Sequence, residues 1–310
     1  MGNFLGFDTS NYTTSVAYFD GSKFIQKKQL LPIKEGERGI RQSDAVFHHT
    51  MAYPKLLGEL LQNTCKNITA VGASVKPTTQ DGSYMPCFIV GEGVANAVSS
   101  AYGVPLYRFS HQQGHIAAAI YSSGQTRLLE EKFLAFHVSG GTTDLVVCEP
   151  DDNEIIKTTP YASSSDLKAG QAVDRIGVKM GIPFPAGKGI ESLALKSDKV
   201  FKNKIKLYNG CCSLSGLENK CLKMISDGES NEDVAKFLLS YIADTVSAMT
   251  ESALSELGDL PVVFAGGVMS NTIIRGIIES RFQAYFAEPE FSCDNAAGIA
   301  YLASIKASKK

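Results

Sequence analysis

The sequence lacks three features that would assign the protein to a compartment or a partner by composition alone. It has no long uncharged apolar run, and its start is not a basic stretch followed by an apolar segment, so we expect neither a membrane span nor secretion. Its 30 lysines and arginines nearly balance 32 aspartates and glutamates, so any RNA contact must be a local patch. Its seven cysteines contain no Cys-x-x-Cys pair, which favours reduced thiols. We therefore predict a cytoplasmic protein that binds no membrane and no DNA.

What the sequence does contain is enough apolar content for two compact units. The chain has 310 residues, of which 44% are hydrophobic. Short apolar runs alternate with amphipathic segments, which favours sheets flanked by helices. Two strand–turn–strand units, at residues 4–19 and 133–148, each begin such a segment. The pattern predicts an α/β protein with lobes at residues 1–127 and 128–310, and a last helix that packs back on the first lobe.

Three polar or glycine-rich turns follow predicted strands in order. They lie at residues 8–14, 139–143 and 266–271. A single glycine pair after a strand is weak support for a site, because such pairs often only satisfy backbone geometry. Three turns rich in amides and hydroxyls are, however, what a phosphate-binding cleft requires. We therefore expect a ligand cleft between the lobes.

A histidine pair gives the sharpest local pattern. Ser110 and Gln113 fit a capping box, which predicts that a helix begins there. His111 and His115 then lie one turn apart on one face, a spacing that suits two imidazoles on one metal ion. The alternative is that both histidines only cap the helix or form local hydrogen bonds. The His-Glu-x-x-His motif of zinc proteases is absent.

Seven motifs, in order along the whole chain, resemble those of the TsaD/Gcp family (Kae-type, peptidase M22-like) of tRNA threonylcarbamoyladenosine synthases. They are Gly-Phe-Asp-Thr-Ser at residues 6–10, Ser-His-Gln-Gln-Gly-His at 110–115, Val-Ser-Gly-Gly-Thr at 138–142, Gly-Gln-Ala-Val-Asp-Arg at 170–175, Pro-Ala-Gly at 185–187, Ala-Gly-Gly-Val-Met-Ser-Asn at 265–271 and Cys-Asp-Asn-Ala-Ala-Gly-Ile-Ala-Tyr at 293–301. The resemblance implies a two-lobed actin-like ATPase (ASKHA) fold. Each lobe would be a mixed sheet flanked by helices, with the ligand cleft between the lobes.

The resemblance also implies one divalent metal ion, which would be Fe, Zn or Mg. Its ligands would be His111, His115 and Asp294, and we add His137 as a fourth. His137 stands where some relatives carry a metal-touching tyrosine and others a leucine, so its alternative is a strand histidine that points into the core. The alternative for Asp294 is a helix N-cap, and one residue can serve both roles.

An adenine nucleotide, or threonylcarbamoyl-AMP, is the second ligand that the resemblance implies. Asp174 would accept hydrogen bonds from ribose hydroxyls, and its alternative is an ordinary charge on a helix. The residues of the first turn assigned to catalysis are Asp8, Ser10 and Thr13. The residues assigned to nucleotide binding are Val138, Ser139, Gly140, Gly141, Thr142, Asp174, Gly187, Gly266, Gly267 and Asn271.

The implied reaction is transfer of a threonylcarbamoyl group from its adenylate to an adenosine beside the tRNA anticodon, with TsaB- or TsaE-like subunits as partners. The chain departs from the family pattern at three places. The first turn has Tyr12 and Thr13 where the family has two acidic residues. Thr142 stands where His or Asn is usual, and Gln171 where Glu is usual. These departures suggest a divergent paralogue. Three alternatives stay open: a carbamoyl- or acyl-adenylate transferase with another acceptor, a phosphotransferase of the sugar-kinase type, which would lack the paired histidines, and a noncatalytic nucleotide-binding partner subunit.

Overall fold

The computed structural model describes residues 2–10, 12–32, 40–64, 67–294 and 296–309. The chain forms two compact units. Unit 1 comprises residues 1–131, 149–158 and 288–310, and unit 2 comprises residues 132–148 and 159–287. The chain thus returns to unit 1 twice, which a single cut near residue 127 does not capture. None of the described helices has the length and apolarity needed to cross a bilayer.

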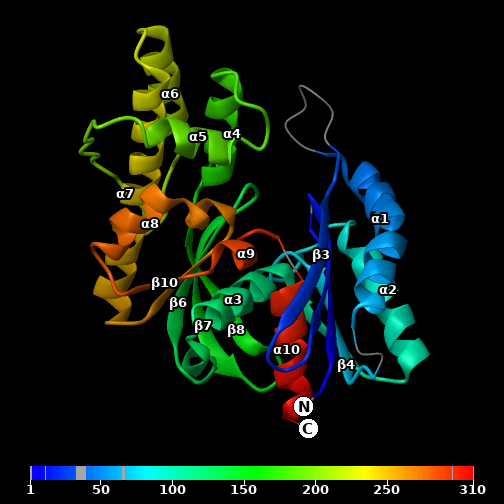
Figure 1. Cartoon of the computed structure of the whole chain (residues 1–310). Helices are drawn as coiled ribbons and strands as arrows, with labels where there is room; N and C mark the ends of the chain where they lie inside the picture. The colour runs from blue at the N-terminus through cyan, green and yellow to red at the C-terminus, as the bar shows by residue number, and fades with distance from the viewer. Residues whose placement is uncertain (1, 11, 33–39, 65–66, 295, 310) are drawn as a thin grey trace. The chain divides into compact units, whose positions relative to one another are not determined.

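The first sheet has five strands in the order β3-β2-β1-β4-β5 (Figure 1). β1 and β2 form the antiparallel hairpin expected around the first turn, with Gly6 opposite Ala17. β4 runs parallel to β1, and β5 runs parallel to β4 and lies at the edge of the sheet. The strands are β1 (Phe4–Thr9), β2 (Thr13–Phe19), β3 (Phe24–Leu30), β4 (Ala70–Lys76) and β5 (Leu106–Ser110).

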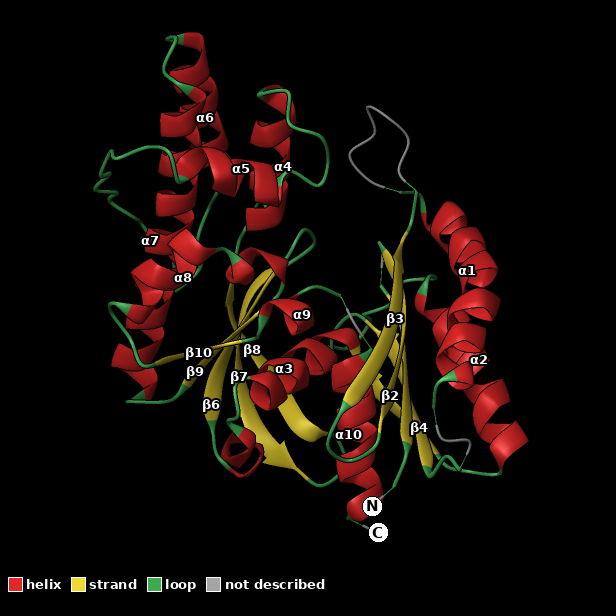
Figure 2. Cartoon of the chain, viewed as in Figure 1, coloured by secondary structure: helices red, strands yellow, loops and turns green. Residues whose placement is uncertain are grey.

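Helices cover both faces of this sheet. α1 (Gln42–Gln62) and α2 (Phe88–Tyr102) lie side by side on one face, while α10 (Ala297–Ser308) packs on β1, β2 and β4 (Figure 2). α3 (His111–Ser122) packs against α10. Ala45, in the first turn of α1, already faces the core.

Glycine lets α10 approach the first sheet and α3 closely. A Cβ on Gly6 would lie 2.3 Å from the carbonyl oxygen of Ala296, and one on Gly298 would lie 1.8 Å from the carbonyl oxygen of Gly114. Any larger residue at these positions would push α10 away. This packing places the segment before α10 beside the ends of β1 and α3.

The second sheet has the order β10-β9-β6-β7-β8. β6 and β9 are parallel, whereas β6 and β7 form an antiparallel hairpin. Phe264 stacks between Phe136 and Phe286, with ring centroids 5.2 and 4.7 Å away, and ties β9 to both neighbours. The strands are β6 (Phe133–Val138), β7 (Thr143–Asp151), β8 (Ile155–Ser163), β9 (Val262–Ala265) and β10 (Ala284–Phe286).

The remaining helices follow the alternation predicted from the sequence. Five α-helices belong to unit 2, and its long α7 packs against α5, α6 and α8. They are α4 (Ala169–Lys179), α5 (Gly187–Ala194), α6 (Ser215–Ser226), α7 (Asn231–Leu257) and α8 (Thr272–Glu279). The short elements are η1 (Thr126–Glu130) and α9 (Pro289–Ser292) in unit 1 and η2 (Gly267–Ser270) in unit 2.

Candidate active site

The predicted capping box fixes the start of α3. The Ser110 hydroxyl accepts from the Gln113 amide at 3.1 Å, and the Gln113 side chain accepts from the Ser110 amide at 2.7 Å. Gln113 also donates to the Ile156 carbonyl at 2.8 Å. With its first turn held in this way, α3 presents His111 and His115 on one face.

Four polar side chains from three segments of unit 1 converge around this face. The Nε2 atoms of His111 and His115 lie 3.1 Å apart. Oδ1 of Asp294 lies 3.6 Å from the first and 3.2 Å from the second. The Ser10 hydroxyl donates to Oδ2 of Asp294 at 2.6 Å. The structure thus brings together residues 284 positions apart, and the N-cap of α10 is Ala296, not Asp294.

Asp8 contacts Nδ1 of His111, the ring nitrogen that does not face Asp294. Its carboxylate is fully buried, and Oδ1 accepts from the Ser74 hydroxyl at 2.5 Å and lies 2.8 Å from Nδ1 of His111. Asp8 accepts a hydrogen bond from Nδ1–H of His111, and this directs Nε2 of the ring toward Asp294. Oδ2 of Asp8 is buried and has no hydrogen-bond partner among the described residues.

Charge and burial set the protonation states in this cluster. Burial lowers the pKa of His111, but the charge of Asp8 and the bonds to Asp294 and Asp8 outweigh it and raise the pKa to about 10. Burial and the neighbouring His111 charge lower the pKa of His115. Burial acts to raise the pKa of Asp294, but its hydrogen bonds with the two histidines outweigh burial and hold this pKa well below its usual range. Burial raises the pKa of the nearby Cys87 thiol to about 12, so it supplies no thiolate.

These groups fit a divalent metal ion. Two imidazole nitrogens and one carboxylate oxygen converge within 3.6 Å of one another, and the carboxylate behind His111 is the outer partner that metal-binding histidines usually have. Imidazole donors suit zinc and iron better than magnesium, which prefers oxygen ligands. Among the three predicted ions, the donor set favours Fe or Zn.

Two other residues assigned from the sequence belong to strands. His137 belongs to unit 2, where it is buried in β6 opposite Asp144, and its role as a ligand stays a prediction. Thr13 is buried in β2 opposite Leu30, and among the described residues it makes no hydrogen bond to the cluster. Asn11, which begins the departure from the family pattern in the first turn, lies outside the described residues.

The turn assigned to the nucleotide lies at the carboxyl end of β6, in unit 2. The Ser139 amide donates to the Thr142 carbonyl at 3.0 Å, and the two hydroxyls lie 2.8 Å apart. A Cβ on Gly140 or Gly141 would meet no atom within 4 Å. The turn is therefore internally bonded and leaves open space above its glycines, which suits a ligand close to the backbone.

The glycine turn after β9 packs against the end of β6. Gly266 has φ +97°, and a Cβ there would lie 2.4 Å from the Val138 carbonyl oxygen. Because β6 and β9 are parallel, both turns lie at the same edge of the sheet, where α/β proteins bind ligands. Gly267 begins η2, and Asn271 uses its side-chain oxygen to cap α8, accepting from two amides at 3.1 Å.

Asp174 and Gly187 meet near the same edge. Gly170, at the start of α4, donates to the Ser139 carbonyl at 3.2 Å, so α4 begins against the first of these turns. Asp174 Oδ1 accepts from the Ala186 amide at 2.8 Å, next to Gly187, the first residue of α5. Burial raises the pKa of Asp174 although the Ala186 amide opposes the shift. Asp174 thus positions the start of α5.

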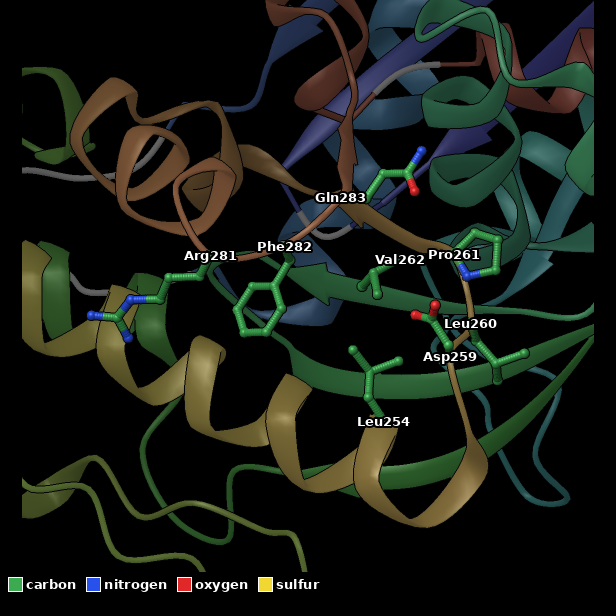
Figure 3. A pocket seen from close by; sticks show the side chains of 8 residues that line it. All are labelled: Leu254, Asp259, Leu260, Pro261, Val262, Arg281, Phe282 and Gln283. Carbon is green, nitrogen blue, oxygen red and sulfur yellow. The ribbon is translucent and has the colours of Figure 1, made fainter.

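A cavity of about 270 Å³ lies at the opposite end of β9. Pro261 and Val262 line it together with Leu254 and Phe282 (Figure 3). Since Gly266 follows the other end of β9, this cavity is separate from the nucleotide turns.

Two supporting residues, Ser74 and His49, were not predicted from the sequence. Ser74 holds Asp8, and His49 holds the first hairpin through Thr14, with Nδ1 2.8 Å from its hydroxyl. Burial lowers the pKa of His49 to about 4. The signal for Ser74 was a polar residue near the carboxyl end of a strand, and for His49 a histidine at a core-facing helical position.

Comparison with known proteins adds a family and a fold. The sequence model of TsaD, described as tRNA N6-adenosine threonylcarbamoyltransferase, matches residues 25–301. A protein of that name from Streptococcus pneumoniae (strain ATCC 700669 / Spain 23F-1) is 30% identical, over 96% of this chain and 90% of its own. One from Streptococcus suis (strain 05ZYH33) is 28% identical, over 97% and 91%.

Solved structures of lower identity share the fold. Full-length HypF in its phosphate- and nucleotide-bound form aligns with a TM-score of 0.61 at 12% identity, covering 99% of this chain and 46% of HypF. Component A of the Acidaminococcus fermentans (R)-2-hydroxyglutaryl-CoA dehydratase aligns with 0.57 at 16% identity, over 99% and 100%. The predicted actin-like fold class is confirmed.

Proposed function

The chain belongs to the TsaD family of tRNA N6-adenosine threonylcarbamoyltransferases, and we propose that it transfers a threonylcarbamoyl group from threonylcarbamoyl-AMP to N6 of an adenosine beside the tRNA anticodon. The observation that carries the proposal is the convergence of His111, His115 and Asp294 in unit 1. In the reaction N6 bonds to the carbamoyl carbon, the bond from that carbon to the phosphate oxygen breaks, AMP leaves and N6 loses a proton to solvent.

The turns of unit 2 would bind the adenylate. The open space above Gly140 and Gly141 would let the phosphate approach the backbone of the turn at residues 138–142, and the Gly266-Gly267 turn would let the backbone approach the nucleoside. Asp174 keeps one carboxylate oxygen for the Ala186 amide and would offer the other to the ribose hydroxyls. Gly187 would admit the sugar beside it.

His111, His115 and Asp294 would hold the divalent ion, with His137 as the additional ligand that we propose. Such an ion supplies Lewis-acid polarisation of a carbonyl and neutralises the charge on a departing phosphate. Asp8 fixes the ring of His111, and Ser10 fixes the carboxylate of Asp294.

Ser10 is better suited to positioning than to attack. Its hydroxyl donates to Asp294, whose pKa lies well below the usual range, and such a carboxylate is a weak general base. The N6 amine would attack the adenylate directly, so the reaction needs no covalent enzyme intermediate. Asp8 and Ser10, which the sequence assigned to catalysis, would act through the metal ligands.

The acceptor in this proposal is tRNA, and TsaB- or TsaE-like subunits would be the protein partners in the cytoplasm. The family match covers both units. The first turn lacks acidic residues at Tyr12 and Thr13, yet it still supplies Asp8, which contacts His111. These contacts favour retained transferase chemistry over a noncatalytic role, since a scaffold has no need of a converging donor set.

The test is to incubate metal-loaded protein with threonylcarbamoyl-AMP and unmodified tRNA and to quantify modified adenosine by mass spectrometry of the nucleosides. Wild type should form it, and Asp294→Asn should reduce the rate by more than about 100-fold. Asp227→Asn, which changes an exposed aspartate at the end of α6, is the matched control and should not. Adenylate binding without any modified adenosine, even with partner subunits added, would contradict the proposal.

A further inference from the structure

Residues 201–208, between α5 and α6, alternate strictly between partly buried and exposed residues. Figure 1 shows a loop between these two helices. Period-two alternation is what an extended backbone produces when one face packs on the protein. The partly buried residues are Phe201, Asn203, Ile205 and Leu207. The exposed residues are Lys202, Lys204, Lys206 and Tyr208. We call the three exposed lysines the lysine row.

The inward residues fasten this segment to α7. The ring of Phe201 packs edge-on against Phe237, with centroids 5.3 Å apart. The Asn203 side-chain amide donates to Asp244 at 3.0 Å, about two turns beyond Phe237 along α7. Leu207 packs against the core of unit 2. The outward side chains therefore stand at defined positions instead of on a loosely held loop.

The lysine row lacks the carboxylates that neutralise its neighbour. Lys199 lies 2.9 Å from Asp233 and 3.4 Å from Glu229. No member of the row lies within 4.0 Å of a carboxylate oxygen in the part of the chain that the structure describes. An extended backbone separates alternate residues by about 6.6 Å, which is the spacing expected for the Cα atoms of the three lysines.

Tyr208 continues the row as an aromatic residue. It is 81% exposed, and two hydrogen bonds of 2.9 Å between its backbone and that of Cys211 hold it in a tight turn. An exposed ring at the end of a row of cations is an unusual surface for a chain whose formal net charge is only −2.

We propose that the lysine row and Tyr208 bind the tRNA acceptor. The lysines contact successive phosphates of one strand, and Tyr208 stacks on an unpaired base. Regularly spaced cations recognise a phosphate backbone, and aromatic side chains recognise bases in loops and single strands. The inference rests on the proposed function, because that function supplies RNA as the partner. The surface of unit 2 that binds the tRNA is then the lysine row with Tyr208.

A lipid surface is the competing partner for lysines with one aromatic residue. Phe201 packs on α7 and Leu207 on the core, so among the described residues 201–208 Tyr208 is the only exposed aromatic residue available for insertion. Peripheral membrane binding uses a broad apolar face beside its cations. RNA therefore fits this surface better.

The experiment measures binding of fluorescent unmodified tRNA to the full-length protein at several salt concentrations, apart from transfer. One triple variant changes the lysine row to glutamine. The matched control changes three exposed lysines of unit 1 to glutamine: Lys23, Lys28 and Lys55. The row variant should lower the slope of log K against log salt by about 2 to 3, and the control should leave it unchanged. Tyr208→Ala should weaken binding about tenfold, and Tyr208→Phe should not.

Each outcome separates this inference from the proposed function. If wild type modifies tRNA but the row variant binds it as the control does, the inference is overturned and the function stands. If wild type binds tRNA through the row without modifying it, the inference stands and the proposed function fails. Row-dependent binding to phosphatidylserine vesicles, with tRNA binding unchanged, would overturn the inference in favour of a membrane partner. All positions changed are exposed, so unchanged thermal unfolding should show that the variants fold.

Discussion

Replacing Asp8 by asparagine should weaken metal binding although Asp8 would not touch the metal. Its fully buried carboxylate lies 2.8 Å from Nδ1 of His111 and fixes which ring nitrogen faces Asp294. Asparagine keeps the shape and one acceptor oxygen but removes the charge. Loss of an outer carboxylate typically costs 10- to 100-fold in metal affinity, or about 1.4 to 2.7 kcal/mol. We expect Asp8→Asn to fall in this range.

The assay is titration with Co²⁺, followed by its visible absorption, with Zn²⁺ as competitor. Ser74→Ala removes a hydrogen bond to the same oxygen of Asp8 without changing its charge, so its effect should stay below about threefold. Asp174→Asn changes a partly buried carboxylate of unit 2 and should have no effect. Unchanged affinity in Asp8→Asn, beside a His111→Ala variant that loses it, would refute the orienting role.

Three further predictions follow from other contacts. Burial lowers the pKa of His49 from 6.5 to about 4, so between these pH values unfolding takes up a proton. The free energy of unfolding should therefore fall by up to about 3 kcal/mol as the pH drops through this window. His49→Gln should flatten this dependence in urea unfolding, and an unaltered pH profile would show that another group causes it. Gly266→Ala should cost at least about 2 kcal/mol of stability, since its φ is +97° and its Cβ would meet the Val138 carbonyl, whereas Gly140→Ala should unfold like wild type but bind adenylate more weakly. His137→Ala should weaken Co²⁺ binding about tenfold if His137 is a ligand, and unchanged affinity would leave a three-ligand set.

Local patterns predicted much of the fold because local physics determines it. The capping box at Ser110 and Gln113 fixes the start of α3 through contacts three residues apart. The hairpins around the first and second turns follow from short apolar runs on either side of a polar segment.

The division into units and the roles around the metal site depend on contacts that no local pattern records. Residues 288–310 join unit 1 because glycines at positions such as 6 and 298 let α10 pack closely, which is visible only once α10 is placed. Asp8 and Ser10 were assigned to catalysis because they lie in the polar first turn. Their partners are Ser74 on a neighbouring strand and Asp294, 284 residues from Ser10.

Lysines alternate with other residues from 202 to 206, and a period of two is typical of an extended stretch with one side anchored. The sequence could not show that Asn203 and Phe201 hold it on α7, nor that Lys199 is paired while the row is not.

The most direct test of the account is a single-turnover reaction in which threonylcarbamoyl-AMP carries a labelled threonine. The acceptors are unmodified tRNA and the same tRNA with guanosine in place of the adenosine beside the anticodon. The account predicts one label transferred to the adenosine-bearing tRNA for each AMP released, none to the guanosine tRNA, and none with His111→Ala. Release of AMP with equal labelling of both tRNAs, or no labelling of either by metal-loaded wild type with partner subunits present, would contradict it.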